Sequence, residues 1–68
     1  MGKTAKTSSL SVILPCLNEE ETLGASIQKA FEGIEKTNLF GEVIVADNGS
    51  HDHSVEIAKK HGARVVEV

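Results

Sequence analysis

The stretch VIVADNGSHDHS, residues 43–54, changes from apolar to polar residues after its fourth residue. Those first four residues are apolar and mostly β-branched, as is typical of a strand that is buried on both faces of a sheet. The remainder is polar and surrounds Gly49, a residue type that permits the positive φ of a tight turn. We therefore expect a strand over residues 42–46, followed by a polar loop.

The segments on either side extend an alternation of strands and helices. Residues 10–14 form another short apolar run, which Pro15 is expected to end. Residues 53–62 predict a helix that stops at Gly62, and residues 64–68 predict a third strand. Between the first two strands, apolar residues recur at helical spacing and predict a helix with one buried stripe, formed by Leu23, Ile27, Ala30, Phe31 and Ile34.

This order of elements predicts an α/β fold, the β-α-β-α-β start of a Rossmann-like parallel sheet. The connections are long enough only for crossover helices, which implies parallel strands and right-handed crossovers. Two crossovers wound in one direction place both helices on the same face of the sheet, so the other face would be bare. Because the chain stops within the third strand, at Val68, we expect an N-terminal piece of a larger protein, or a subunit that assembles through its sheet.

Composition narrows the class of protein. The 68 residues predict one small domain, residues 10–68, after a disordered polar head, residues 1–9. With 40% hydrophobic and 25% charged residues, the chain is typical of a soluble globular protein. A net charge of -3 without a basic cluster argues against a nucleic-acid partner, and no run approaches the roughly 20 apolar residues of a membrane segment. A single cysteine, Cys16, fits a cytoplasmic setting.

Two polar loops should meet at one edge of this sheet, because ligands of open parallel sheets bind outside the carboxyl ends of the strands. Asp47 is expected to end the second strand and to be fixed by the sheet. Since it caps nothing obvious, we favour a ligand role: a carboxylate there suits adjacent N–H donors, such as those of uracil or guanine. For Gly49 and Asp52 we favour the shaping of a turn and the capping of a helix, and Ser50 is a second candidate for that cap.

The sequence gives less support to a phosphate-binding loop, a metal site or a reactive cysteine. The segment after the first strand, PCLNEEE, is neither a dinucleotide-binding glycine loop nor a P-loop, and its three glutamates would repel a pyrophosphate. His51 and His53 lie on a turn where at most two ligands could point together, so we predict exposed histidines and no metal site in this chain. Cys16 has no histidine partner at a recognisable spacing and is expected to be a small buried hydrophobe.

The two motifs together resemble a known family. VILPCLNEEETL, followed some thirty residues later by VIVADNGSHDHSVEIA, is similar to the opening of the family 2 glycosyltransferases with the GT-A fold, especially the dolichol-phosphate mannosyltransferase branch. The resemblance covers residues 10–68. Two departures stand out: Asn48 replaces the usual second aspartate, and Leu17 stands where the family often has an aromatic that stacks on the base.

The resemblance implies a nucleotide-binding role for five residues. Pro15 and Leu17 would line the nucleoside pocket, and Glu19 would face the ribose hydroxyls. Val45 would lie beside the base, and Asp47 would accept the base N–H, in agreement with the argument from the strand end.

For the complete protein, the resemblance implies a glycosyltransferase that moves a sugar from GDP- or UDP-sugar, by inverting displacement, to a polyprenyl phosphate or another hydroxyl acceptor. The family's Mg²⁺- or Mn²⁺-binding Asp-x-Asp, its catalytic base and its acceptor site come later than residue 68, so no catalytic residue is assigned and the chain alone is expected to be inactive. We expect a cytoplasmic location, with membrane association only through regions outside this chain. The alternative is a non-enzymatic α/β module that binds a partner through its open sheet face.

Overall fold

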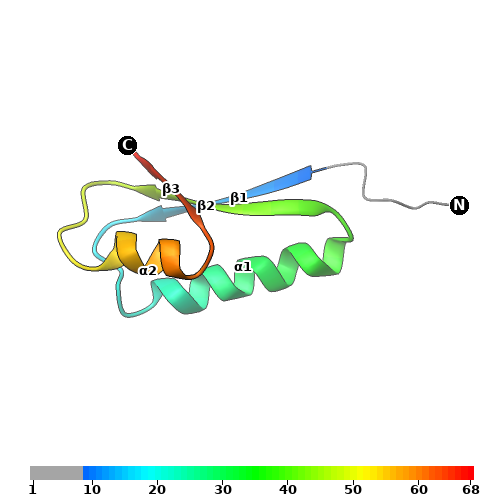
Figure 1. Cartoon of the computed structure of the whole chain (residues 1–68), viewed down its shortest axis with the longest axis horizontal. Helices are drawn as coiled ribbons and strands as arrows, with labels where there is room; N and C mark the ends of the chain where they lie inside the picture. The colour runs from blue at the N-terminus through cyan, green and yellow to red at the C-terminus, as the bar shows by residue number, and fades with distance from the viewer. Residues whose placement is uncertain (1–8) are drawn as a thin grey trace, which may run out of the picture.

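The computed structural model describes residues 9–68, in which three strands alternate with two helices (Figure 1). The elements are β1 (Ser9–Cys16), α1 (Leu23–Thr37), β2 (Phe40–Asp47), α2 (Ser54–Lys60) and β3 (Arg64–Glu67). The predicted head, residues 1–9, lies outside the described residues except for Ser9, at which β1 begins. Each predicted strand and helix is present; β1 is longer than expected at both ends, and β2 begins two residues earlier than expected.

The three strands form one parallel sheet in the order β1-β2-β3, which confirms the predicted fold class. β1 pairs with β2 from Ser9↔Phe40 to Cys16↔Asp47, and Asp47 pairs in turn with Glu67 of β3. The carboxyl ends of all three strands therefore lie in one row, and the loops that follow β1 and β2 leave the sheet from that row.

Pro15 does not end β1, contrary to expectation, because its missing N–H falls on the free side of the strand. The N–H of Asn48 donates to the carbonyl oxygen of Cys16 at 2.9 Å, so the backbone of Cys16 faces β2. Successive residues of a strand point their backbone groups to opposite sides, and Pro15 therefore faces away from β2. Proline is tolerated in a strand where no ladder hydrogen bond is lost.

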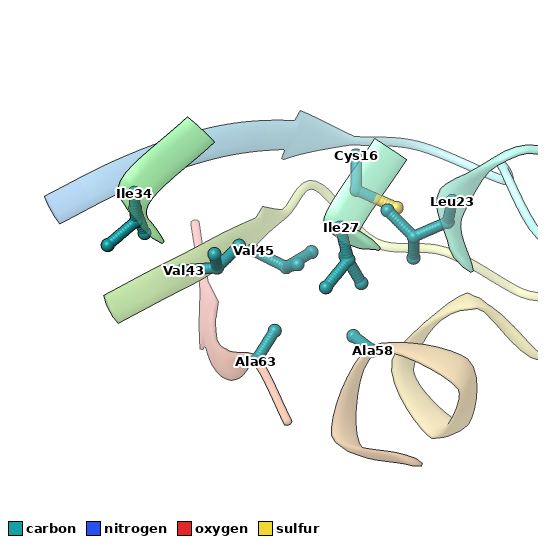
Figure 2. Packing of buried hydrophobic residues seen from close by; sticks show 8 residues of the cluster. All are labelled: Cys16, Leu23, Ile27, Ile34, Val43, Val45, Ala58 and Ala63. Atoms are coloured by element: carbon teal, nitrogen blue, oxygen red, sulfur yellow. The ribbon is translucent and has the colours of Figure 1, made fainter. Parts of the chain in front are cut away.

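The core lies between the sheet and the two helices. Figure 2 shows its eight buried apolar side chains, which are Cys16, Leu23, Ile27, Ile34, Val43, Val45, Ala58 and Ala63. The predicted stripe of α1 is confirmed, because three of its members are in this core and the other two, Ala30 and Phe31, pack against it. Ile27 and Val45 are fully buried, so the centre of α1 rests on the centre of β2.

Both helices lie on the same side of the sheet, as expected, and within residues 9–68 no helix covers the other side (Figure 1). On that open sheet face, the side chain of Ile13 is 63% exposed and that of Val66 is 38% exposed. The register places Ile13 beside Ile44, and Ala46 beside Val66. The apolar runs of β1 and β2 therefore divide between a covered face and an open face.

Residues with positive φ close the turns after the helices. Asn38 follows α1 in the left-handed region, with φ 59, and its N–H donates to the carbonyl oxygen of Glu35. Gly62, with φ 88, follows α2 and confirms the predicted stop of that helix. Neither helix of the described residues has the length and apolar character needed to cross a membrane; the longer one, α1, has 15 residues.

Candidate functional site

The loops that leave β1 and β2 lie side by side, as the sequence predicted. We call residues 17–22 the β1 loop and residues 48–53 the β2 loop. They begin next to each other, because Cys16 and Asp47, the last residues of the two strands, are partners in the sheet. Backbone N–H groups of each loop donate to side chains of the other loop or of the adjoining helix start, so the two loops form one unit.

The inner part of this unit is a reciprocal pair of hydrogen bonds. The N–H of Asn18 donates to Oγ of Ser50 at 2.9 Å. In return, the N–H of His51 donates to Oδ1 of Asn18 at 2.8 Å. Asn18 has φ 52, a left-handed conformation that asparagine tolerates better than most residues. The β1 loop is thus bent at Asn18 and tied there to the β2 loop.

The outer part repeats this reciprocity and also binds the first residue of α2. The N–H of Glu20 donates to Oδ2 of Asp52 at 3.2 Å, and the N–H of His53 donates to Oε1 of Glu20 at 3.0 Å. The N-cap position of α2 is His53, which makes no side-chain cap hydrogen bond; instead, Oδ1 of Asp52 accepts the N–H of Ser54, the first residue of α2, at 2.9 Å. Ser54 is fully buried, and its Oγ accepts the N–H of Glu19 at 2.9 Å.

Asp47 ends β2, as predicted, but the expectation that it caps nothing is wrong. Its Oδ2 accepts the N–H of Ser50 at 3.1 Å, and its Oδ1 accepts the hydroxyl of the same residue. The side chain therefore closes the turn around Gly49, which has φ 87, and only 3% of Asp47 is exposed. Two carboxylate oxygens offer about four acceptor positions, and Ser50 occupies two of them.

Hydrogen bonding keeps the carboxylates of Asp47 and Asp52 ionised. The bond from the Ser50 hydroxyl holds the pKa of Asp47 below its ordinary value, against the opposing effect of burial. Hydrogen bonding by Ser54 likewise lowers the pKa of Asp52, again against burial. Each carboxylate is therefore a fixed negative charge at neutral pH, able to accept but not to donate a hydrogen bond.

The lowered pKa values predict a loss of stability in acid. A carboxyl whose pKa is lower in the folded state stabilises the fold above its ordinary pKa of about 3.9, and this stabilisation is lost as the pH falls through the folded value. We expect the unfolding free energy to fall below about pH 4, and to fall less steeply in Asp52→Asn. Urea titrations of wild type and variant at pH 7, 4 and 3 measure this.

A control for net charge is Glu32→Gln, which removes one negative charge from an exposed position of α1. This variant should keep the acid profile of the wild type. If Asp52→Asn and wild type lose stability in parallel between pH 4 and pH 3, the hydrogen bonds of Asp52 do not contribute to the acid sensitivity.

The other sequence-predicted site residues divide between three environments. Pro15 and Glu19 line a hollow of about 110 Å³ beside the start of α1. Leu17 is 51% exposed at the start of the β1 loop. The side chain of Val45 is fully buried in the core, and its main chain lies between β1 and β3 in the sheet. Asp47 borders a separate hollow of about 250 Å³ at the end of the sheet.

A hollow of about 460 Å³ lies over the β1 loop and is strongly acidic. Its lining residues are Asn18, Glu19, Glu20, Glu21, Thr22 and Asp52. Such a wall repels the diphosphate of a nucleotide, which agrees with the lack of a phosphate-binding glycine loop. Within residues 9–68, no group of three or more histidine, cysteine or acidic side chains is placed to hold a metal ion, so these residues do not fit a divalent metal site.

Sequence reasoning missed how the loops are joined. Ser50, the second candidate for the cap of α2, does not cap it; its Oγ connects Asp47 with Asn18. Asn18 and Ser54 were given no role at all. The available signals were weak: an asparagine that tolerates positive φ, and a serine at the start of a helix.

The chain matches proteins of known family over nearly its whole length. The family described as glycosyl transferase family 2 matches residues 11–67. Glucosyl-3-phosphoglycerate synthase of Petrotoga mobilis is 43% identical over 65 residues, which are 93% of this chain and 20% of that protein. Dolichyl-phosphate beta-glucosyltransferase of Drosophila melanogaster is 40% identical over 68 aligned residues, covering 87% of this chain and 21% of that protein.

Solved structures show the same fold. Glucosyl-3-phosphoglycerate synthase from Mycobacterium tuberculosis, crystallised with Mn²⁺, uridine diphosphate and glucosyl-3-phosphoglycerate, superimposes with a TM-score of 0.75 at 39% identity, over 90% of this chain and 21% of that one. Mannosyl-3-phosphoglycerate synthase from Rubrobacter xylanophilus gives 0.75 at 30% identity, over 88% of this chain and 19% of that one. The chain spans about a fifth of the length of these relatives.

Proposed function

This chain belongs to glycosyl transferase family 2 and has the parallel β-α-β-α-β start of a GT-A fold, and on that premise we propose that it forms the nucleoside-recognition part of a glycosyltransferase. The observation that carries the proposal is that the β1 loop and the β2 loop are joined by hydrogen bonds at the carboxyl ends of adjacent parallel strands. Open parallel sheets bind their ligands at this edge. Asp47, fixed at the strand end and ionised, supplies an acceptor in that place.

We propose that Asp47 accepts an N–H of the base and that Glu19 accepts from the ribose hydroxyls. Pro15 and the 51% exposed Leu17 would complete the site; because Pro15 and Glu19 line one hollow and Asp47 borders another, the nucleoside would have to bridge the two. The expected position of Val45 beside the base stays a prediction from the family resemblance, since its side chain is buried in the core and its main chain is paired within the sheet. UDP is the first candidate nucleotide, because the similar Mycobacterium tuberculosis enzyme was solved with UDP; GDP is the second.

The reaction proposed for the complete protein is an inverting sugar transfer. An acceptor oxygen attacks the anomeric carbon of the donor, the bond from that carbon to the diphosphate breaks, and the nucleoside diphosphate leaves. Where the acceptor is a hydroxyl, its proton goes to a base outside these residues; an ionised phosphate oxygen has no proton to lose. In either case this chain binds and orients but holds no catalytic residue. A Mg²⁺ or Mn²⁺ ion, which residues 9–68 do not fit, would need ligands elsewhere in the protein.

For the acceptor, we propose a hydroxyl or phosphate oxygen on a phosphate-bearing molecule. Two kinds of relative support this class: the synthases named for 3-phosphoglycerate, and the enzyme named for dolichyl phosphate. A lipid phosphate and a small phosphorylated acid share the anionic group, and activity assays with each distinguish them. With a lipid acceptor, the complete protein would work at the cytoplasmic face of a membrane, which it would contact through regions outside this chain.

The rival function is a non-enzymatic module that binds a protein partner through the open sheet face. The exposure of Ile13 and Val66 on that face favours it. The two functions differ in what the loops do: in the module they are structural only, and no nucleotide binds.

Calorimetric titration of the complete protein with UDP and GDP, in the presence of Mn²⁺, tests the proposal. We expect binding of at least one of them. A folded protein that binds neither nucleotide would rule out the recognition role and leave the partner-binding module.

A further inference from the structure

Asn18 lies at the bend of the β1 loop in an unusual backbone conformation. Within residues 9–68, only two residues other than glycine have positive φ, Asn18 with φ 52 and Asn38 with φ 59. Asn38 is the C-cap of α1, and among the hydrogen bonds of residues 9–68 none joins its side chain to another element. Asn18, in contrast, uses its side chain to hold a second loop.

A continuous line of hydrogen bonds joins Asn18 to the end of β2. Asp47 accepts from the hydroxyl and N–H of Ser50, and Oγ of Ser50 accepts from the N–H of Asn18. Oδ1 of Asn18 then returns to the β2 loop by accepting the N–H of His51 at 2.8 Å. The side-chain amide oxygen of Asn18 is therefore hydrogen-bonded to the β2 loop.

We infer that Asn18 is a positioning residue, which sets the place of Leu17 and Glu19 relative to Asp47 and so shapes the nucleoside site. This inference rests on the proposed function. Its reason is geometric: Leu17 and Glu19 are the immediate neighbours of Asn18 and lie on an exposed loop, while Asp47 is held by the sheet. Fixing Asn18 by two hydrogen bonds fixes both neighbours before the ligand arrives, which removes an ordering cost from binding.

The test compares Asn18→Gly with Asn38→Gly in the complete protein. Glycine keeps the positive φ and the N–H at either position and adds the same chain flexibility, but at position 18 it also removes the acceptor for His51. We expect Asn18→Gly to raise the KM for the nucleotide-sugar donor, and the Kd for the nucleotide, about five- to tenfold, the effect of one hydrogen bond. kcat at saturating donor should stay within about twofold, because Asn18 does not touch the reacting atoms.

The controls separate positioning from general stability. Asn38→Gly should leave KM and kcat unchanged, and its melting temperature should be no lower than that of Asn18→Gly, which also loses the acceptor for His51. Asn18→Asp keeps the oxygen acceptor and the tolerance of positive φ, and should restore a KM within about threefold of the wild type. Equal KM in wild type and Asn18→Gly overturns the inference while leaving the proposed function standing, whereas a wild type that binds no nucleotide overturns both.

Discussion

Replacing Ile27 by alanine is expected to lower the unfolding free energy of this 68-residue chain by about 2–5 kcal/mol, the range measured for isoleucine truncations in cores. Ile27 is fully buried at the centre of the one core, between the sheet and the helices. A domain of this size has a total stability of roughly 3–10 kcal/mol. The substitution should therefore leave much of the protein unfolded at 25 °C, as measured by urea denaturation followed by circular dichroism.

The matched control is Ile13→Ala, which removes the same atoms from the open sheet face. Because the side chain of Ile13 is 63% exposed, we expect a loss below about 1 kcal/mol. Comparable losses at the two positions, together with a stability that depends on protein concentration, would mean that the open face is covered by self-association. Comparable losses at the two positions, with a stability that does not depend on protein concentration, would contradict the assignment of the core itself.

Replacing Asp47 by alanine is the second large effect, and it acts on binding. In the complete protein we expect nucleotide affinity to fall at least about tenfold, because the base loses a charge-assisted acceptor. The turn also loses the partner of Ser50, so the melting temperature should fall as well. Calorimetric titration with nucleotide, alongside thermal denaturation, measures the two effects separately.

Ser50→Ala distinguishes direct recognition from loss of the turn. It removes the hydroxyl that joins Asp47 to Asn18 but leaves the carboxylate of Asp47 in place. If Asp47 contacts the base, Asp47→Ala should weaken binding several-fold more than Ser50→Ala does. Equal losses in the two variants would show that Asp47 serves only to hold the β2 loop, and the acceptor for the base would have to be sought elsewhere.

Much of the fold could be predicted from the sequence, because the signals that specify it are local and periodic. The helical spacing of Leu23, Ile27 and Ile34 indicated the buried face of α1, and the apolar runs indicated the strands. Crossover geometry then implied a parallel sheet with both helices on one face. The same reasoning placed Asp47 at the end of β2 and the two loops side by side, since a strand end can be located without knowing any tertiary contact.

Only the tertiary structure decided how individual side chains of the site are used. Val45 turned out to face the core because strand side chains alternate, and the covered face depends on where α1 packs, which a continuous apolar run does not reveal. The loops are joined by hydrogen bonds between residues 32 to 35 positions apart, such as those of Asn18 with Ser50 and of Glu19 with Ser54. Such partners are brought together by the pairing of β1 with β2, so no local sequence pattern predicts them. The sequence alone therefore located the candidate site, and the packing of the sheet determined which of its polar atoms hold the loops and which remain able to meet a ligand.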